Sequence, residues 1–270
     1  MTTSRTLKEL MDLSDRVVLV TGGGGHVGGE AAAAVAELGA AVVLADIDEA
    51  GCEKAAESLA KQFGTETAVF PVDLAEQETL QALPGRIVDQ FGRLDAIVNA
   101  AAFVGTSALE GWTVPFEEQS IDTWRSALEV NLTSVFVLVQ AAAKLLRVSG
   151  RGSIINIASI YGMAGPDMRL YEGTALGNPA AYGVSKGGLL QLTRWLATVL
   201  APGIRVNAVT PGGIQRKQPD VFIDKYLEKV PLGRMAVEED IKGAVAYLAS
   251  DLSAYVTGQN IVVDGGWTVW

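Results

Sequence analysis

Histidine and cysteine are nearly absent from this sequence. Its 270 residues contain one histidine, His26, and one cysteine, Cys52. A disulfide needs two cysteines, so an internal disulfide framework is excluded. Zinc sites of the usual kind take several His or Cys ligands, so we expect no metal site of that type. A Ser-His-Asp triad would have to use His26 itself, which leaves a single position for that chemistry.

Positive charge and long apolar runs are also scarce. The chain has 21 Lys and Arg against 31 Asp and Glu, a net charge of −10 and a pI near 4.7. Nucleic-acid binding depends on clustered Lys and Arg, so we expect no nucleic-acid partner. No uninterrupted apolar run reaches the roughly 20 residues that span a bilayer. The opening "MTTSRTLKELMDLSD" has charges where a signal peptide needs an apolar stretch. We therefore expect a cytoplasmic protein without membrane association.

The chain is rich in short β-branched runs that alternate with Ala- and Leu-rich segments of helical length. This alternation of strands and helices implies βαβ units. Strands that are apolar throughout are covered by helices on both faces. We predict an α/β fold, a doubly wound Rossmann-type parallel sheet of about seven strands with helices on both faces, in which residues 1–270 form a single NAD-binding domain. The predicted strands are 16–21, 40–45, 67–72, 94–99, 152–158, 204–210 and 260–265, and the predicted helices are 27–38, 49–63, 76–91, 121–147, 180–200 and 237–249.

The stretch "LVTGGGGHVGGE" (19–30) contains six glycines directly after the first predicted strand. Gly23, Gly25 and Gly28 satisfy G-x-G-x-x-G at a strand-to-helix turn, where backbone N–H groups can approach a dinucleotide pyrophosphate. Asp46 ends the second strand, where an acid accepts hydrogen bonds from ribose hydroxyls and repels a 2′-phosphate. NAD is therefore predicted over NADP. The alternatives are a plain tight turn and a solvated strand-end acid.

Four polar residues form a candidate catalytic set. Tyr182 and Lys186 are spaced i and i+4 on a predicted helix, so both project from one face. A nearby ammonium favours phenolate, which would lower the Tyr182 pKa and suit the phenol for proton exchange with an alcohol or ketone. Ser159 follows a predicted strand, and Asn131 lies inside an apolar helix, where its amide needs a partner. An exposed helical pair, a cap and a core amide are the alternative interpretations.

Taken together, these residues resemble the short-chain dehydrogenase/reductase family over nearly the whole chain. The resemblance implies that Tyr182 is the general acid/base and that Lys186 binds the nicotinamide ribose and lowers the tyrosine pKa. It also implies that Ser159 positions the substrate oxygen and that Asn131 holds a water in a proton relay. The matching segments are TGGGGHVG (21–28), PVDLA (71–75), IVNAAA (97–102), EVNLTSVF (129–136), NIASIYG (156–162), YGVSK (182–186), RVNAVTPGGI (205–214) and VTGQNIVVDGG (256–266).

The resemblance also implies a cofactor-binding set, from which this chain departs at three positions. His26 replaces the second glycine of the family motif, and we interpret it as a loop residue near the phosphates, not the catalytic base. Ala100 removes an amide that usually braces the central sheet, and Arg216 stands where a threonine commonly meets the nicotinamide carboxamide. The implied set is Gly22, Gly25, His26, Val27, Gly28, Asp46, Ile47, Asp73, Leu74, Asn99, Ala100, Ala101, Tyr182, Lys186, Pro211, Gly212 and Ile214.

Substrate choice is expected to lie in three segments, 103–120, 160–180 and 213–235. The middle segment is longer than the family's usual connection and resembles that of members acting on sugar acids or surface-carbohydrate precursors. Long loops beside catalytic groups commonly carry specificity. We predict Ser159, Arg169, Tyr171 and Tyr182 as substrate residues, with Arg169 pairing with a substrate carboxylate; Asp167, Glu172 and Asn178 are further polar candidates. The alternative is that these are solvated surface groups.

The predicted function is therefore that of an NAD(H)-dependent oxidoreductase, which interconverts a secondary alcohol and a ketone on a sugar-like or hydroxy-acid compound. One alternative is a 3-oxoacyl reductase, which Asp46 and the acidic surface disfavour. Another is a non-catalytic NAD-binding regulator, which the four intact catalytic residues disfavour. The helices 121–147 and 180–200 are apolar around most of their circumference, which predicts a subunit interface in a homotetramer or homodimer.

Overall fold

A single seven-stranded parallel sheet organises the protein. The computed structural model describes residues 4–104 and 107–270, so positions 105 and 106 of the predicted segment 103–120 lie outside the described residues. The strand order is β3-β2-β1-β4-β5-β6-β7, with all neighbours parallel, which confirms the predicted Rossmann-type α/β architecture. The strands are β1 (Val17–Thr21), β2 (Ala41–Asp46), β3 (Thr67–Pro71), β4 (Ala96–Asn99), β5 (Gly152–Ile157), β6 (Ile204–Pro211) and β7 (Asn260–Val263).

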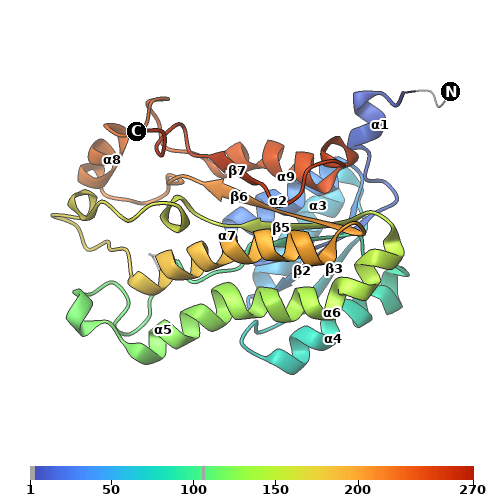
Figure 1. Cartoon of the computed structure of the whole chain (residues 1–270), viewed down its shortest axis with the longest axis horizontal. Coiled ribbons are helices and arrows are strands. Elements are labelled where there is room, and N and C mark those ends of the chain that lie inside the picture. The colour runs from blue at the N-terminus through green and yellow to red at the C-terminus, as the bar shows by residue number, and fades with distance from the viewer. Residues whose placement is uncertain (1–3, 105–106) are drawn as a thin grey trace.

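Helices cover both faces of this sheet (Figure 1). The side chains of α4, α6 and α7 pack with one set of strand side chains, including Leu19, Ile97 and Ile154. Those of α2, α3 and α9 pack with the alternate set, such as Val20 and Ile155. The five inner strands therefore bury both of their faces, which explains their continuous apolar runs, whereas the edge strands β3 and β7 are only partly buried. The helices are α1 (Leu7–Met11), α2 (His26–Glu37), α3 (Glu49–Phe63), α4 (Gln77–Phe91), α5 (Ile121–Leu128), α6 (Ser134–Ser149), α7 (Ala180–Leu200), α8 (Asp220–Leu227) and α9 (Lys242–Ala249).

The helix predicted over 121–147 differs from the structure at its centre. A π-helical turn, Glu129–Thr133, joins α5 to α6 and contains Asn131. Turns of this kind insert one extra residue into a helix and are frequent at functional sites. The apolar pattern of the sequence continues through the turn, so periodicity alone does not reveal it.

The same helical stretch is long and apolar enough to cross a bilayer by length and composition. It runs over Ile121–Ser149. One face of it, which includes Leu138, Ala142 and Leu146, is fully or almost fully buried against the sheet and α4. A helix that packs in this way belongs to the core of a globular unit, and its apolar character needs no membrane to explain it.

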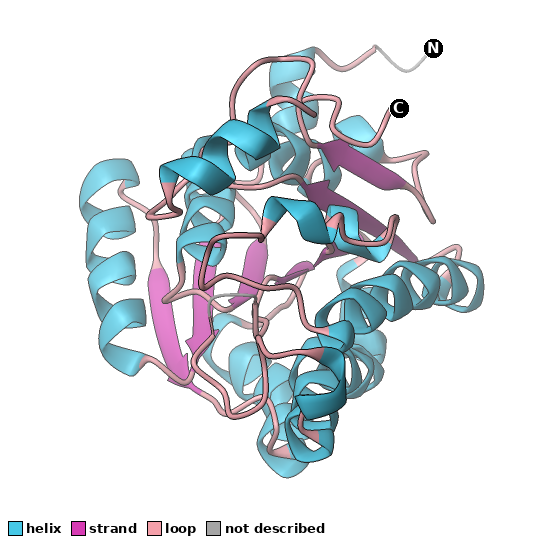
Figure 2. Ribbon diagram, turned by 90° about the vertical axis from the view of Figure 1, so that its left-hand side faces the viewer, coloured by secondary structure: helices cyan, strands magenta, loops and turns pink. Residues whose placement is uncertain are grey.

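The strand ends gather the predicted site residues at one edge of the sheet. Because all seven strands are parallel, the residues that follow β1, β2, β4, β5 and β6 emerge at the same side. Figure 2 views this end of the molecule, where loops and short helices lie over the strand ends. The segment 160–180 and α8 both lie at this end (Figure 1). Helix α8 lies within the predicted segment 213–235 and is not among the predicted helices.

Candidate active site

The glycine stretch forms the turn between β1 and α2. Gly22 has a left-handed backbone (φ 72°), and a Cβ on it would lie 2.6 Å from the backbone nitrogen of Ala101. A Cβ on Gly28, in the first turn of α2, would lie 2.0 Å from the carbonyl oxygen of Gly22. Neither position can therefore carry a side chain without displacing backbone. The two glycines hold a tight cradle in front of the α2 N-terminus, where backbone N–H groups favour anions.

Asp46 closes this cradle on the side of β2. Its Oδ2 accepts a hydrogen bond from the backbone N–H of Gly24 at 3.1 Å, and its Oδ1 accepts one from Asp48 at 3.1 Å. Each oxygen keeps a lone pair, so the carboxylate can still accept hydrogen bonds from ribose hydroxyls. Ile47, which follows it, is exposed. This combination of a glycine cradle and a strand-end acid fits the pyrophosphate and ribose of a dinucleotide.

The turn after β4 is braced by a residue that the sequence analysis did not select. Asn99 Nδ2 donates to Asn156 Oδ1 at 2.8 Å, and Asn156 Nδ2 donates to Thr193 Oγ1 at 2.8 Å. This chain connects β4, β5 and α7 at a fully buried level. The missing amide at Ala100 therefore has a counterpart on the neighbouring strand, since Asn156 pairs with Asn99 in the sheet register. An asparagine inside the apolar run "SIINIA" was the available signal.

Lys186 is buried one helical turn after Tyr182. Its ammonium donates to the carbonyl oxygen of Ile157 at 2.7 Å, and burial lowers its pKa to about 8. Burial also raises the pKa of Tyr182 above its usual value, although a hydrogen bond with Ser159 acts in the opposite direction. The protein side chains by themselves therefore do not lower the Tyr182 pKa, contrary to the expectation from the Tyr-x-x-x-Lys spacing. The reason is that burial disfavours the phenolate, while Lys186 bonds the end of β5.

Ser159 lies between the end of β5 and a short 3-10 turn, Ile160–Gly162. Its Oγ accepts a hydrogen bond from the backbone N–H of Tyr161 at 3.2 Å, and the residue is 7% exposed. Its hydroxyl proton is the donor in the hydrogen bond to Tyr182, which acts to lower the tyrosine pKa. Ser159 and Tyr182 therefore present two hydroxyl groups beside each other.

Asn131 has a different surrounding from the one that the family resemblance implies. Its Oδ1 accepts from the backbone N–H of Phe103 at 2.7 Å, and its Nδ2 donates to the Phe103 carbonyl at 3.0 Å and to Ser185 Oγ at 3.1 Å. Ser185 Oγ in turn donates to the carbonyl of Tyr182. The side-chain amide of Asn131 is thus committed to protein groups, and it ties the segment after β4 to the turn of α7 that carries Tyr182.

A cavity of about 830 Å³ collects much of the predicted site. It extends from the start of α2 to α8. The predicted residues in its lining are Ser159, Tyr182 and Lys186 from the catalytic set, His26, Val27, Ala100, Pro211, Gly212 and Ile214 from the cofactor set, and Tyr171 from the substrate set. The predicted residues outside its described lining are Gly22, Gly25, Gly28, Asp46, Ile47, Asp73, Leu74, Asn99, Ala101, Asn131 and Arg169.

Two of these outer residues are engaged elsewhere. Leu74 is buried in the hydrophobic core beside β3. Arg169 turns away from the cavity: its Nε and Nη2 bond both carboxylate oxygens of Asp167, at 2.8 and 2.7 Å, and its side chain is 78% exposed. Arg169 is thus paired with an acid two residues earlier and lies outside the described lining of the cavity, and its pairing with a substrate carboxylate stays a prediction.

Helix α8 holds the segment 160–180 in place. Asp167 forms ion pairs with Arg169 and Lys229, and these two cations hold its pKa well below the usual range. Lys225 donates to the backbone carbonyls of Arg169 at 2.8 Å and Glu172 at 3.1 Å. These contacts fix both segments as one wall of the cavity.

This wall contains aromatic residues that the sequence analysis missed. Tyr161, Phe222 and Tyr226 line the cavity together with Met235. The ring of Phe222 lies 5.5 Å from that of Tyr171 and 5.9 Å from that of Tyr226. The i, i+4 spacing of Phe222 and Tyr226 was the available signal for an amphipathic helix.

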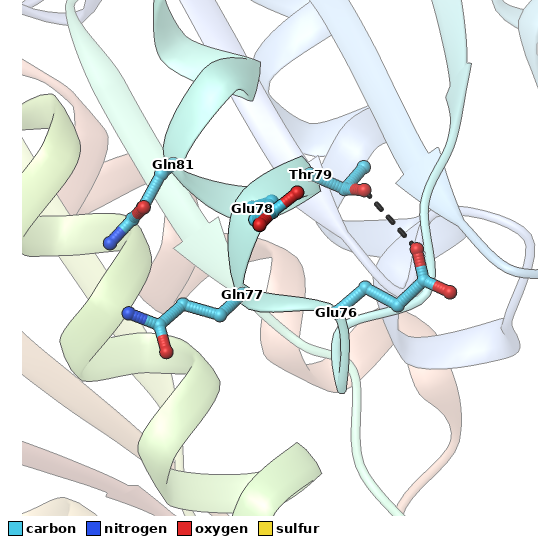
Figure 3. Close-up of a pocket in the computed structure, with 5 residues that line it drawn as sticks. All are labelled: Glu76, Gln77, Glu78, Thr79 and Gln81. Carbon is cyan, nitrogen blue, oxygen red and sulfur yellow. Dashed lines mark hydrogen bonds between the residues drawn. The ribbon is translucent and has the colours of Figure 1, made fainter.

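Other hollows carry none of the predicted site residues in their described linings. One lies on the first turn of α4 and is lined by Glu76, Gln77, Glu78, Thr79 and Gln81 (Figure 3). There the Thr79 hydroxyl donates to Glu76 at 3.3 Å. Another lies between residues 231–240 and the end of β7. The cavity at the strand ends is therefore the candidate active site.

Comparisons with known proteins agree with this geometry. A family model described as enoyl-(acyl carrier protein) reductase matches residues 25–268. The cis-4-hydroxycyclohexanecarboxylate dehydrogenase of Sinomonas cyclohexanicum is 33% identical over 260 residues, which cover 94% of this chain and 97% of that protein. The NADP-dependent mannitol dehydrogenase of Hypocrea jecorina is 32% identical over 275 residues, which cover 98% of this chain and 97% of the relative.

A solved structure extends the likeness to three dimensions. The short-chain dehydrogenase from Leptospira borgpetersenii with bound NAD⁺ superposes with a TM-score of 0.82 at 31% sequence identity. The match covers 99% of this chain and 98% of that one. The likeness therefore includes the sheet, the helices on both faces and the segments over the strand ends.

Proposed function

Because the chain belongs to the short-chain dehydrogenase/reductase family, we propose that it is an NAD(H)-dependent oxidoreductase that interconverts a secondary alcohol and a ketone. The observation that carries the proposal is the cavity that joins Ser159, Tyr182 and Lys186 to the glycine cradle. A substrate in this cavity would have its oxygen within reach of two hydroxyl groups. The relatives act on a hydroxy acid and on a polyol by their names, so both classes enter the proposal.

The residues of this chain fit NAD better than NADP. Gly22 and Gly28 leave room for the pyrophosphate, Val27 and Ile214 line the path of the nicotinamide, and Asp46 would accept hydrogen bonds from the adenosine ribose. When bound, the nicotinamide would accept or supply the hydride. The Asp46 carboxylate would repel a 2′-phosphate. We expect Asp73 to contact the adenine and the other cofactor residues, among them Asn99 and Pro211, to line the rest of the cofactor.

The proton chemistry falls to the side chains in the centre of the cavity. The Ser159 hydroxyl, which accepts a hydrogen bond from the backbone of Tyr161, would donate its proton to the substrate oxygen. Tyr182, in its phenolate form, would take the alcohol proton during oxidation, and its phenol would return the proton during reduction. Lys186, whose ammonium also bonds the end of β5, would bind the nicotinamide ribose. Asn131 would fix the helical turn that positions Tyr182.

A cofactor-linked absorbance assay tests the proposal. The protein is mixed with NAD⁺ or NADP⁺ and a panel of hydroxy acids, polyols and simple alcohols, and formation of the reduced cofactor is followed. We expect turnover with NAD⁺ and a loss of about 10²- to 10⁴-fold in kcat for Tyr182→Phe. Tyr255→Phe is the matched control, because Tyr255 is fully exposed. Cofactor binding without turnover of any alcohol would instead favour a regulator on the same fold.

The proposal also includes a homo-oligomer in the cytoplasm, a tetramer or a dimer. It is supported by apolar side chains that stand exposed on α6 and α7, namely Phe136 (40% exposed), Trp195 (53%) and Val199 (45%). Exposed apolar surface of this kind is typical of subunit contacts. Size-exclusion chromatography with light scattering at low concentration tests this, and a clean monomer would overturn it. The acidic charge continues to disfavour nucleic acid as a partner.

A further inference from the structure

Two tyrosines that line the candidate active site share a hydrogen bond. The hydroxyl oxygens of Tyr161 and Tyr171 lie 2.8 Å apart, and Asn178 Nδ2 donates to the Tyr171 oxygen at 3.3 Å. Tyr161 lies two residues after Ser159, and Tyr171 affects the pKa of Tyr182, so the pair lies close to the reacting groups. We call Tyr161 and Tyr171 the phenol pair.

A count of protons shows what the phenol pair offers to a ligand. The pair has two O–H donors and uses one of them in the bond between the two oxygens. Asn178 adds a donor from outside, so it occupies an acceptor site and leaves the count of free protons unchanged. The Tyr171 hydroxyl donates to the Tyr161 oxygen, so the Tyr161 hydroxyl proton has no acceptor among the described residues, and both phenols line the cavity. Burial raises the pKa of Tyr161 well above its usual range, which keeps this phenol protonated.

The remaining lining is poor in hydrogen-bond acceptors. No Asp or Glu belongs to the lining within residues 4–104 and 107–270. Gln218 is occupied at both ends, since its Nε2 donates to the Ile214 carbonyl at 2.8 Å and its Oε1 accepts from the Arg216 N–H at 2.6 Å. Several other lining residues on the same side are apolar: Val104, Ile160, Leu176, Phe222 and Met235. A polyol brings a hydroxyl donor on each carbon, and such a wall would leave several of them unpaired.

The charged side chains in the described lining of the cavity are positive, whereas the net charge of the whole chain is negative. The chain has a net charge of −10, yet the charged side chains in the described lining are Lys186, Arg216 and Lys217. Arg216 bonds Glu238 at 2.9 Å and also lies on the side of His26, near the expected pyrophosphate. An anionic ligand group therefore meets cations and a free O–H donor, and no carboxylate among the described lining residues. An O–H donor bonds a carboxylate more strongly than a neutral acceptor.

From these observations, and resting on the function proposed above, we propose that the phenol pair binds a carboxylate of the substrate through its free O–H. The substrate is then a hydroxy acid with a largely apolar carbon skeleton, whose carbinol reaches Ser159 and Tyr182 while its carboxylate reaches Tyr161. Tyr171 and Asn178 are positioning residues, because they act on the ligand through the orientation of the Tyr161 hydroxyl. The apolar skeleton packs against Phe222 and Met235.

Selectivity between an acid and its neutral amide tests the proposal. The probes are cis-4-hydroxycyclohexanecarboxylate, its carboxamide and D-threitol, and kcat/KM is measured for each with NAD⁺. We expect the wild type to prefer the acid, and Tyr161→Phe to reduce the acid-to-amide ratio about 10- to 100-fold, mainly through KM. Tyr171→Phe is expected to reduce the ratio less. Tyr255→Phe controls for the loss of a phenol outside the cavity.

A binding measurement separates failure of this proposal from failure of the proposed function. Cyclohexanecarboxylate has no hydroxyl to oxidise, and its affinity for the protein with NAD⁺ is measured by calorimetry for the wild type and Tyr161→Phe. Turnover of D-threitol above the acid, with an unchanged ratio in Tyr161→Phe, overturns the carboxylate site and leaves the dehydrogenase intact. Tyr161-dependent binding without any turnover supports the carboxylate site and removes the dehydrogenase. Neither turnover nor Tyr161-dependent binding overturns both.

Discussion

Replacing Asn131 by alanine is expected to weaken the protein and the active site together. The amide is 1% exposed and makes three hydrogen bonds, two to the backbone of Phe103 and one to Ser185. Each such bond contributes about 1 kcal/mol net, and an unpaired buried partner costs more. Phe103 is partly exposed, so water can replace some of the loss. We therefore expect a loss of about 2–4 kcal/mol in the free energy of unfolding, or roughly 5–12 °C in Tm.

The assay combines thermal unfolding with steady-state kinetics. Asn131→Ala is also expected to lower kcat, because Ser185 would lose the partner that fixes it beneath the Tyr182 carbonyl. Asn207→Ala is the matched control: Asn207 is equally buried and bonds the backbone of Val256 and Gln259, away from Tyr182. It should lower Tm and leave kcat unchanged. A Tm for Asn131→Ala within about 2 °C of the wild type, with kcat strongly reduced, would refute this reasoning and favour a purely catalytic role.

Three further predictions concern charge. Asp46→Ala is expected to reduce the ratio of kcat/KM for NAD⁺ over NADP⁺ by about 10- to 100-fold, because it removes both an acceptor for the ribose and the repulsion of a 2′-phosphate; an unchanged ratio in the cofactor assay would contradict this. Burial lowers the pKa of Lys186 from 10.5 to about 8, so between these pH values the unfolded chain binds one proton more than the folded chain. The free energy of unfolding of the wild type, measured in urea, should therefore rise relative to that of Lys186→Met from pH 8 to 10.5. Asp167→Asn should lower Tm at pH 7, and the difference should shrink as the pH falls below about 4, since the folded pKa lies below the ordinary Asp value near 4; a difference independent of pH would show that the ion pairs contribute nothing.

The sheet could be predicted from the sequence because its inner strands are buried on both faces. Runs such as "VVLVT" and "SIINI" contain little besides β-branched and aliphatic residues, and the helical segments between them fix the parallel direction. The π turn at Glu129–Thr133 could not be predicted in this way, because one extra residue leaves the apolar pattern of a long helix nearly unchanged. Helix α8 was not predicted because its two aromatic residues, Phe222 and Tyr226, pack in the wall of the cavity instead of in the central core.

The candidate site could also be predicted only in part, because sequence motifs select residues but do not reveal their contacts in the folded protein. The motif order selected Ser159, Tyr182 and Lys186, and the structure places all three in one cavity. The partner of Arg169 could not be chosen from sequence, since Asp167 and a substrate carboxylate are equally good partners for a guanidinium. The pKa of Tyr182 depends on how deeply the phenol is buried, which the Tyr-x-x-x-Lys spacing does not contain.

The contacts between the segment 160–180 and α8 bear on how new specificities would arise in this scaffold. A chimaera that takes only one of the two segments from a relative would leave Asp167 or Lys229 without its ion-pair partner. Lys225 would also lose the backbone carbonyls to which it donates. Exchange of both segments together would keep these contacts. In recombination or in protein design, these two segments, about 50 positions apart in the chain, should therefore be exchanged as one unit.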